Sequence, residues 1–315
     1  MTLPSMATSN VDDGASDTTS IASSACNYRF ENGRRYHAYK DGSYWGPNDE
    51  KAQEHLDLAH HLWLKTLDDK LHLAPLPRRA SRVLDIGCGT GLWAIEFAER
   101  NPTAQVIGTD LSPTQPTCVP TNCRFELDDA SDEWTYAPNS FDFIHIRSLF
   151  GCIASWPTLY ARALRCLKPG GYIEHVEMSH EFKSPDDSIP AGSAMASMAS
   201  LSARACAVTG KPGDVIYRMK DWMGEAGFKD VKQVEYVWPN GQWPADPKLK
   251  EIGRWSRLHL LHGSEDWTLA LATRALGWEV AKARAFIDQL RENIKDPKIH
   301  AYHDMFVTFA RRPTD

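Results

Sequence analysis

Residues 83–91 read VLDIGCGTG, and this stretch decides the fold. An apolar run leads into a glycine-rich turn, and a helical pattern begins directly after it, near Leu92. Glycine permits a sharp turn and lets the backbone touch a ligand closely. The first turn of the helix offers free N–H groups and a positive dipole end to an anion. A turn of this kind at the carboxyl end of a first strand is where doubly wound sheets bind nucleotides.

Residues around the turn separate the nucleotide classes. A dinucleotide fingerprint needs glycine at position 92, where this chain has Leu92. No Lys-Ser/Thr pair follows the glycines, which argues against a P-loop ATPase. Asp85, at the strand end, suits a ligand with a cationic centre beside a carboxylate, and Asp110 ends the next strand, where a carboxylate can hold two ribose hydroxyls. These features favour S-adenosylmethionine (SAM) and leave a nicotinamide oxidoreductase as the weakest of three hypotheses.

Short apolar runs alternate with helical segments on both sides of the turn. Strands are expected at residues 82–86, 105–109, 124–127, 141–146, 172–176, 231–238 and 304–310, and helices at 217–227, 247–262 and 267–295. An earlier helix is expected to be capped by Asn48, with Leu56, Ala59, Trp63 and Leu67 on one face. Such alternation predicts an α/β fold, a Rossmann-like, doubly wound, mostly parallel sheet of seven strands with a final antiparallel hairpin.

The chain is expected to divide into three parts. These are a disordered tail (residues 1–27), an N-terminal helical lid segment (28–80) and one catalytic domain (81–315) with cap insertions at about 180–215 and 240–300. The 42% of hydrophobic residues suffice for a sizeable core.

Composition excludes several classes of protein. The 35 basic and 41 acidic residues give a net charge of −6, which argues against direct binding of nucleic acid. No apolar run approaches the ~20 residues that span a bilayer. Seven cysteines without a secretory signal are expected to be reduced thiols, with no metal site. We therefore expect a soluble cytoplasmic protein, and nuclear entry through a partner stays open.

Further segments carry a resemblance to a known family. They read ENGRRYH (31–37), PNDE (47–50), FELDDA (125–130) with Trp134, FDFIHIR (141–147) and LKPGGYIE (167–174). With the glycine turn, they make the chain resemble the class I SAM-dependent methyltransferases over residues 30–180, and the wider pattern resembles the fungal LaeA-like methyltransferases. The resemblance implies SAM as cofactor and S-adenosylhomocysteine as product.

The resemblance also implies a cofactor site. Asp85, Gly87, Cys88, Gly89 and Gly91 are expected at the methionine portion, Asp110 and Leu111 at the ribose and one adenine face, Asp129 and Ala130 at the adenine, and His145 nearby. Asp128 is the alternative to Asp129, because one residue of register decides which side chain points inward. Tyr36 and Tyr44 are the expected lid residues over the cofactor, with core packing as the other reading.

The methyl acceptor is harder to read. Transfer from a sulfonium is an in-line displacement, so the enzyme mainly aligns and desolvates the nucleophile. The candidates follow the fourth and fifth strands: His145, Arg147, His175, Glu177 and His180. Arg147 could clamp an acidic acceptor, whereas His145 or His180 could take a proton. Each of the five has a structural role as its alternative.

Two hypotheses about function follow. The first is methyl transfer to oxygen or nitrogen of a small molecule of fungal secondary metabolism. The alternative is a LaeA-like regulatory protein that acts with protein partners in a nuclear complex, with protein methylation or without essential catalysis.

Overall fold

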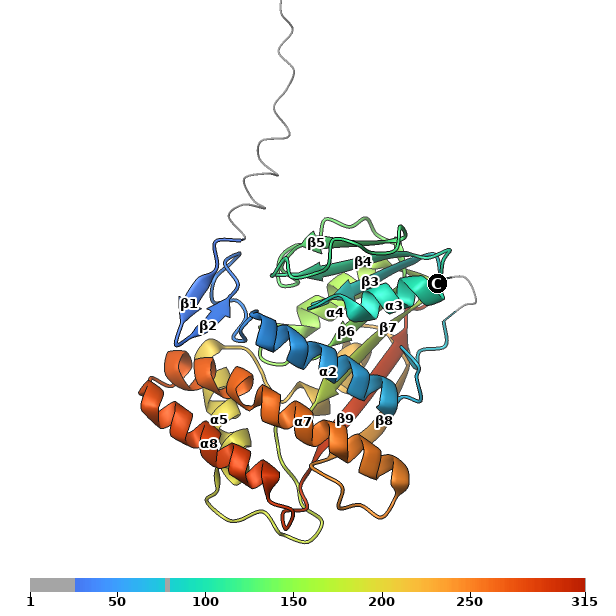
Figure 1. Ribbon diagram of the computed structural model, residues 1–315. Helices are drawn as coiled ribbons and strands as arrows, with labels where there is room; N and C mark the ends of the chain where they lie inside the picture. The colour runs from blue at the N-terminus through green and yellow to red at the C-terminus, as the bar shows by residue number, and fades with distance from the viewer. Residues whose placement is uncertain (1–25, 77–79, 315) are drawn as a thin grey trace, which may run out of the picture.

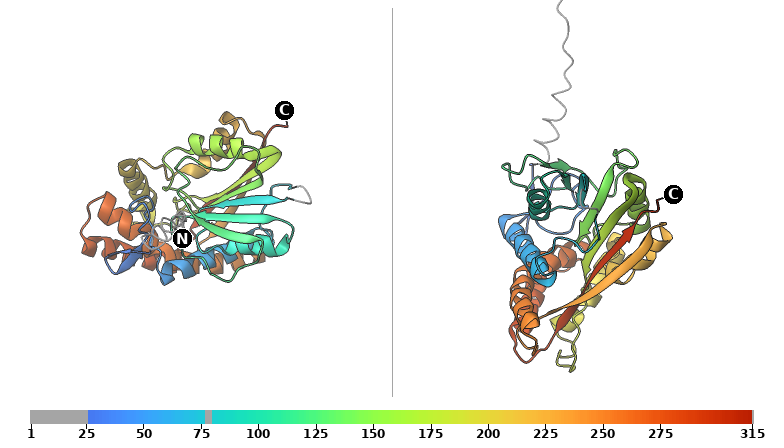
Figure 2. Two further views of the ribbon diagram at one scale, coloured as in Figure 1. Left: turned by 90° about the horizontal axis from the view of Figure 1, so that it is seen from above. Right: turned by 90° about the vertical axis from the view of Figure 1, so that its right-hand side faces the viewer.

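A computed structural model describes residues 26–76 and 80–314. The predicted disordered tail therefore lies outside the described residues, except for Cys26 and Asn27. A seven-stranded sheet forms the centre of the molecule, and helices cover both of its faces (Figure 1). Seen from above, α4 (Trp156–Cys166) lies on one side of the sheet, and α2 (Glu50–Thr66) and α3 (Leu92–Arg100) lie on the other (Figure 2).

The strand order confirms the predicted fold. The strands are β3 (Arg82–Ile86), β4 (Gln105–Asp110), β5 (Cys123–Leu127), β6 (Phe141–Arg147), β7 (Leu167–Met178), β8 (Lys229–Pro239) and β9 (Tyr302–Arg311), and they lie in the order β5-β4-β3-β6-β7-β9-β8. The pairs from β5 to β7 are parallel, whereas β9 runs antiparallel to both β7 and β8. The order reverses between β3 and β6, so a crevice opens beyond their carboxyl ends.

Near-continuous apolar runs in the central strands explain why the sheet is buried on both faces. Val83, Leu84 and Ile86 of β3 are all at most 1% exposed, as expected for a central strand that helices cover on both sides. Trp156 and Tyr160 of α4 fill the core on one face, and Trp93 and Phe97 of α3 fill it on the other.

The remaining elements form the lid and its supports. They are a hairpin of β1 (Arg29–Glu31) and β2 (Arg34–Tyr36), the helices α5 (Ala194–Thr209), α6 (Met219–Glu225), α7 (Pro247–Ala270) and α8 (Val280–Lys295), and the short turns η1 (Val215–Tyr217) and η2 (Leu271–Ala275). Helix α7 packs against α2 and α8, and α8 packs against α5 (Figure 1). Segments far apart in the sequence thus meet over one end of the sheet.

Two expectations about helices were wrong in detail. The segment 267–295 is not one helix, because α7 ends in the π-helical turn η2, and Gly277 adopts a left-handed φ of +65° before α8 begins. The cap of α2 is Asp49 rather than Asn48: the Asp49 carboxylate accepts from the N–H of Ala52. Asn48 instead donates from Nδ2 to Ser112 Oγ at 3.1 Å. In the part of the chain that the structure describes, no helix is long and apolar enough to cross a bilayer.

Candidate active site

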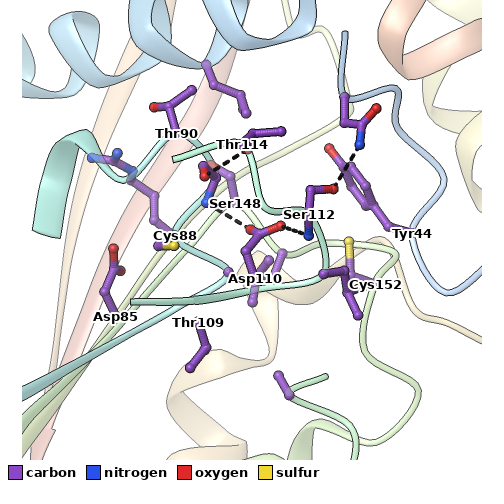
Figure 3. A pocket seen from close by; sticks show the side chains of 18 of the residues that line it. Tyr44, Asp85, Cys88, Thr90, Thr109, Asp110, Ser112, Thr114, Ser148 and Cys152 are labelled. Carbon is purple, nitrogen blue, oxygen red and sulfur yellow. Dashed lines mark hydrogen bonds between the residues drawn. The ribbon is translucent and has the colours of Figure 1, made fainter. Parts of the chain in front are cut away.

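A pocket opens at the carboxyl ends of β3, β4 and β6, where the strand order reverses (Figure 3). It is lined by residues 43, 44, 47, 48, 52, 53, 56, 59, 85, 87–90, 92, 109–112, 114, 128–130, 145, 147–149, 152 and 153. The walls come from the glycine turn, the segments after β4, β5 and β6, and the N-terminal half of α2. Eleven of the predicted cofactor residues lie together here: Tyr44, Asp85, Gly87, Cys88, Gly89, Asp110, Leu111, Asp128, Asp129, Ala130 and His145.

The glycine turn is shaped around the Asp110 carboxylate. The N–H of Gly89 donates to Oδ2 at 2.8 Å, and the N–H of Ser112 donates to Oδ1 at 2.9 Å (Figure 3). Burial raises the pKa of Asp110 to about 6, against the effect of these two hydrogen bonds. Each oxygen keeps acceptor capacity for a further partner. The carboxylate is therefore held ready for hydroxyl donors.

Glycine is required at two positions of the turn for different reasons. Gly87 has a φ of +66°, and a Cβ there would lie 2.5 Å from a methyl carbon of Leu149. Gly91 is the N-cap of α3, with a φ of +83°, and a Cβ there would lie 2.4 Å from Phe125 Cζ. Gly91 is not among the residues that line the pocket and has a structural role at the helix start, so its contact with the cofactor stays a prediction.

Asp85 is a buried acid that faces the pocket. Its side chain shares a hydrogen bond of 2.7 Å with His145 Nδ1, and the His145 ring stacks on Trp93 with centroids 3.8 Å apart. Burial raises the pKa of Asp85 to about 7, although Arg147 opposes the shift. Burial also lowers the pKa of His145 well below its usual value, so this imidazole is neutral and cannot balance the charge of Asp85. A cationic ligand would supply that balance.

Arg147 forms the adjacent wall and is fixed from α2. Its Nη2 donates to His60 Nδ1 at 3.1 Å, and His60 Nε2 lies 3.2 Å from Glu96 Oε1. Because Nδ1 accepts from the guanidinium, the neutral His60 ring carries its proton on Nε2. Burial lowers the pKa of Arg147 to about 10, so the guanidinium stays charged at neutral pH. One end of the pocket is thus lined by Asp85, which can bind a cationic group, and by Arg147, which can bind an anionic group.

A strap of residues 43–48 covers the pocket. The strap is tied down at three points: Tyr44 N–H donates to His37 Nε2 (3.1 Å), Trp45 Nε1 donates to the Phe150 carbonyl (3.2 Å), and Asn48 donates to Ser112. The Tyr44 phenol lies in the pocket wall, where burial raises its pKa well above the usual value. The strap therefore joins the N-terminal segment to β4 and to the loop after β6.

Four further predicted residues lie outside this pocket. Tyr36 is 1% exposed and packs under the Arg274 guanidinium, 3.9 Å from its ring centroid, so it belongs to the hairpin core and not to the cofactor. Glu177 is fully buried and accepts from the N–H of Leu149 at 2.6 Å. His175 lies between Glu177 Oε1 (3.2 Å) and the Tyr160 hydroxyl (2.7 Å). His180 lines a separate cavity.

Residues that the sequence reading missed come mostly from the lid. Asn48, Gln53 and Leu56 reach the pocket from the strap and α2, and Ser148 and Cys152 reach it from the loop after β6. Asn48 belongs to the segment PNDE (47–50), which carries part of the family resemblance. The sequence therefore offered a signal for Asn48 as a pocket residue, although we expected it to be a helix cap. Ser148 directly follows the segment FDFIHIR and could have been expected at the end of that strand, whereas no motif indicated the place of Cys152.

The fold and the site define a class first: the strand order, the glycine turn and the acids at the carboxyl ends of β3 and β4 are those of a class I SAM-dependent methyltransferase. The family described as "Methyltransferase domain" matches residues 58–233. The methyltransferase pytC of Aspergillus terreus is 39% identical over 302 residues, which are 96% of this chain and 93% of that protein. The secondary metabolism regulator LAE1 of Cochliobolus heterostrophus is 37% identical over 289 residues, 90% of this chain and 94% of that protein.

A solved structure is similar at lower identity. Phosphoethanolamine N-methyltransferase 2 of Haemonchus contortus, in complex with SAM, shares 18% identity at a TM-score of 0.46, over 82% of this chain and 52% of that one. The family match over residues 58–233 and the relatives that align over nearly the whole chain show that the chain belongs to the methyltransferase family. It is a SAM-dependent methyltransferase, and its relatives include proteins named as secondary metabolism regulators.

Proposed function

We propose that this chain transfers the methyl group of SAM to oxygen or nitrogen of a small-molecule acceptor of secondary metabolism. The observation that carries the proposal is the strap of residues 43–48, which is tied over the pocket by hydrogen bonds from Trp45 and Asn48. A covered site suits a small acceptor, because water must be excluded from the nucleophile during the transfer. The identity to the methyltransferase pytC over nearly the whole chain agrees with it.

The charges of the pocket suggest how SAM is oriented. Its amino-acid end carries an ammonium and a carboxylate, which match Asp85 and Arg147 in sign. The Asp110 carboxylate, fixed by Gly89 and Ser112, would accept from the ribose hydroxyls. A Cβ at Gly87 or Gly89 would press on Leu149 or Leu56, two side chains that line the pocket, so glycine keeps this wall in place.

The segment after β5 would bind the adenine end of SAM. Asp129 is 8% exposed and its Oδ1 accepts from the N–H of Ser131, so its orientation is set before a ligand binds. We assign the adenine amino group to Asp129, with Asp128 as the alternative because it lines the same wall. Leu111 and Ala130 would hold the ring between them.

SAM supplies an electrophilic methyl group on a sulfonium. The contribution of the chain is to hold the nucleophile in line and to keep water out. Tyr44 and Cys152 line the covered side of the pocket, and burial raises the pKa of both groups, so each stays protonated and neutral at pH 7. His145 acts as a positioning residue, because it orients the Asp85 carboxyl from a stack on Trp93. Arg147 is held by His60 and therefore serves the cofactor rather than an acidic acceptor.

A second candidate function is regulation. The 37% identity to the regulator LAE1 over 94% of that protein favours it. In that case protein partners would bind the chain, methylation of a protein would replace that of a metabolite, and nuclear entry would occur through a partner. The small-molecule proposal places the chain in the cytoplasm without nucleic-acid partners, in line with its net charge of −6.

Transfer of a labelled methyl group tests the two candidates. Purified chain is incubated with tritium-labelled SAM and either a metabolite extract or a protein extract of a fungus, and the label is separated by molecular size. Label in small molecules, lost in Asp110→Ala, supports the proposal. Label that enters proteins alone supports the regulatory candidate, and no transfer to either pool contradicts both forms of catalysis.

A further inference from the structure

A second cavity lies under the lid, between the ends of β7 and β9 and the helices α5, α7 and α8. Its walls are apolar and aromatic, with Phe150, Phe182 and Trp267 among the lining residues. None of the lining residues in the described chain is Asp, Glu, Lys or Arg. A charged group that entered this cavity would lose its hydration without gaining an ionic partner. The cavity therefore favours an uncharged occupant.

Two histidines give the cavity a polar side. His303 Nδ1 donates to the Ser179 carbonyl at 2.9 Å, so the neutral ring presents a bare lone pair on Nε2. His180 Nδ1 shares a hydrogen bond with Ser202 Oγ. In both rings Nε2 is buried without a hydrogen-bond partner. Burial lowers the pKa of His180 to about 3 and that of His303 to about 4, so both imidazoles are neutral at pH 7.

Buried polar atoms in proteins nearly always have a partner. The unpaired Nε2 of His303 calls for a donor, such as a hydroxyl or an N–H group, because a neutral imidazole with Nδ1 protonated can only accept there. A carbonyl or ether group would not satisfy it. The polar part of the occupant is thereby specified as well as the apolar part.

The cavity borders the cofactor pocket through Phe150. The Phe150 ring packs edge-on against His180, with centroids 4.0 Å apart, and stacks against Trp45 at 5.4 Å. Its neighbours in the chain, Leu149 and Cys152, line the cofactor pocket. Phe150 thus lies next in the chain to a residue of the cofactor pocket while its own ring lines the cavity.

The cavity is narrow in this structure, at about 20 Å³, so a ring can enter only if the lining side chains move. Met178 and Met198 both line it. Methionine side chains are unbranched and flexible and adapt readily to a changed neighbour. The walls can therefore widen without a change of fold.

We infer that this cavity receives the apolar part of the methyl acceptor, and that the acceptor is an uncharged, ring-bearing small molecule whose hydroxyl or N–H group donates to Nε2 of the buried His303. The inference rests on the proposed small-molecule function and names the substrate class of that site. The reacting oxygen or nitrogen of such a molecule would extend past Phe150 toward the cofactor pocket.

Two probes of nearly equal shape test the inference. Full-length protein is titrated with 2-naphthol and with 2-methylnaphthalene, of which only the first has an O–H, and binding is followed by the fluorescence of the probe. The titrations are run with and without S-adenosylhomocysteine. We expect 2-naphthol to bind at least tenfold more tightly than 2-methylnaphthalene. In His303→Phe this preference should fall to about twofold or less.

Two methionines of α5 provide a matched pair of variants. Met198 lines the cavity, whereas Met195 is equally buried in the same apolar cluster but does not line it. Met198→Phe should weaken both probes at least tenfold, and Met195→Phe should leave them within about twofold. If Met198→Phe fails to fold by circular dichroism, Leu290→Phe fills the same cavity from α8.

The inference is overturned if the two probes bind equally to the wild-type protein, if 2-naphthol does not bind at all, or if Met195→Phe weakens binding as much as Met198→Phe. Its failure can be told from failure of the proposed function, because SAM binding is measured separately by calorimetry on each variant. Loss of SAM binding by the wild-type chain would contradict the function, whereas the probe titration without cofactor would still report on the cavity.

Discussion

The cofactor pocket and the cavity under the lid are built in opposite ways. The cofactor pocket is built largely from short turns after consecutive strands, and its acids are held by hydrogen bonds to nearby chain, as Gly89 and Ser112 hold Asp110. The cavity under the lid is built from α5, α7 and α8, whose residues lie up to about a hundred positions from β7 in the sequence. It is apolar, and two of its polar atoms are unpaired.

The difference indicates which side chains are oriented by the fold itself and which can change their packing when a ligand binds. Charged groups that are held by backbone amides are preorganised, since their orientation does not depend on a ligand. Methionine and phenylalanine walls can instead repack around a new occupant. The cofactor pocket should therefore respond sharply to single changes, whereas the lid should tolerate changes that preserve volume.

The largest effect is expected from Gly91→Ala, because the new Cβ would meet Phe125 in a backbone conformation that disfavours side chains. Strain and overpacking together should cost about 3–4 kcal/mol of unfolding free energy, measured by urea denaturation. Gly192→Ala is the control, since Gly192 has a φ of +74° in open space and should lose only about 1 kcal/mol. Equal losses in both variants would show that the turn is not tightly packed.

The next largest effect is expected from Asp110→Ala. The variant removes the acceptor of two backbone N–H groups and of the proposed ribose hydroxyls, and charge-assisted hydrogen bonds contribute about 1.5–3 kcal/mol each. We expect SAM affinity to fall about 100-fold by calorimetry. Asp132→Ala, which removes an exposed acid that pairs with Lys40, should stay within about twofold. A similar loss in both would mean that general charge, and not Asp110, attracts the cofactor.

The same contrast explains how far the sequence could be read. The strands and the acids Asp85 and Asp110 were predictable, because short apolar runs and a glycine turn are local patterns. For Tyr36 and Glu177 the sequence left a site role and a structural role open, because a side chain in a short hairpin or a long strand can face either side and only packing decides which. The cavity at His180 was not predictable, since three helices distant in sequence form its walls.

A smaller effect is expected where the lid joins the catalytic sheet. Asp49 caps α2 and also accepts two hydrogen bonds from the buried Arg34, which donates its remaining bond to Asp266 of α7. Asp49→Ala should cost about 2 kcal/mol in urea denaturation, about half of it from the lost cap. Asp246→Ala, which removes only the exposed cap of α7, should cost about 1 kcal/mol. Asp49→Ala should leave SAM affinity within about threefold. A larger change would show that the contacts of the lid also influence the cofactor pocket.

The smallest effect is expected in the dependence of SAM affinity on pH, which tests the charge of the pocket most directly. Burial raises the pKa of Asp85 from 3.8 to about 7, so the free protein is stabilised below about pH 4 relative to its unfolded chain, and that stability is lost as the pH rises toward 7. A cationic ligand needs the ionised form. Between pH 6 and pH 8 the ionised fraction of a group with this pKa rises about tenfold, and SAM affinity should rise with it.

Asp85→Asn separates this group from the other acid of the pocket. Asp110, with a pKa raised to about 6, gains only about twofold in ionised fraction over the same range, so the variant should retain a shallow dependence of that size. The wild-type chain should also release about half a proton per SAM bound at pH 7, visible as a dependence of the calorimetric heat on the buffer's ionisation enthalpy. A flat affinity and no proton release would show that Asp85 is already ionised in the free protein, and the pairing with a ligand cation would then have to be assigned elsewhere.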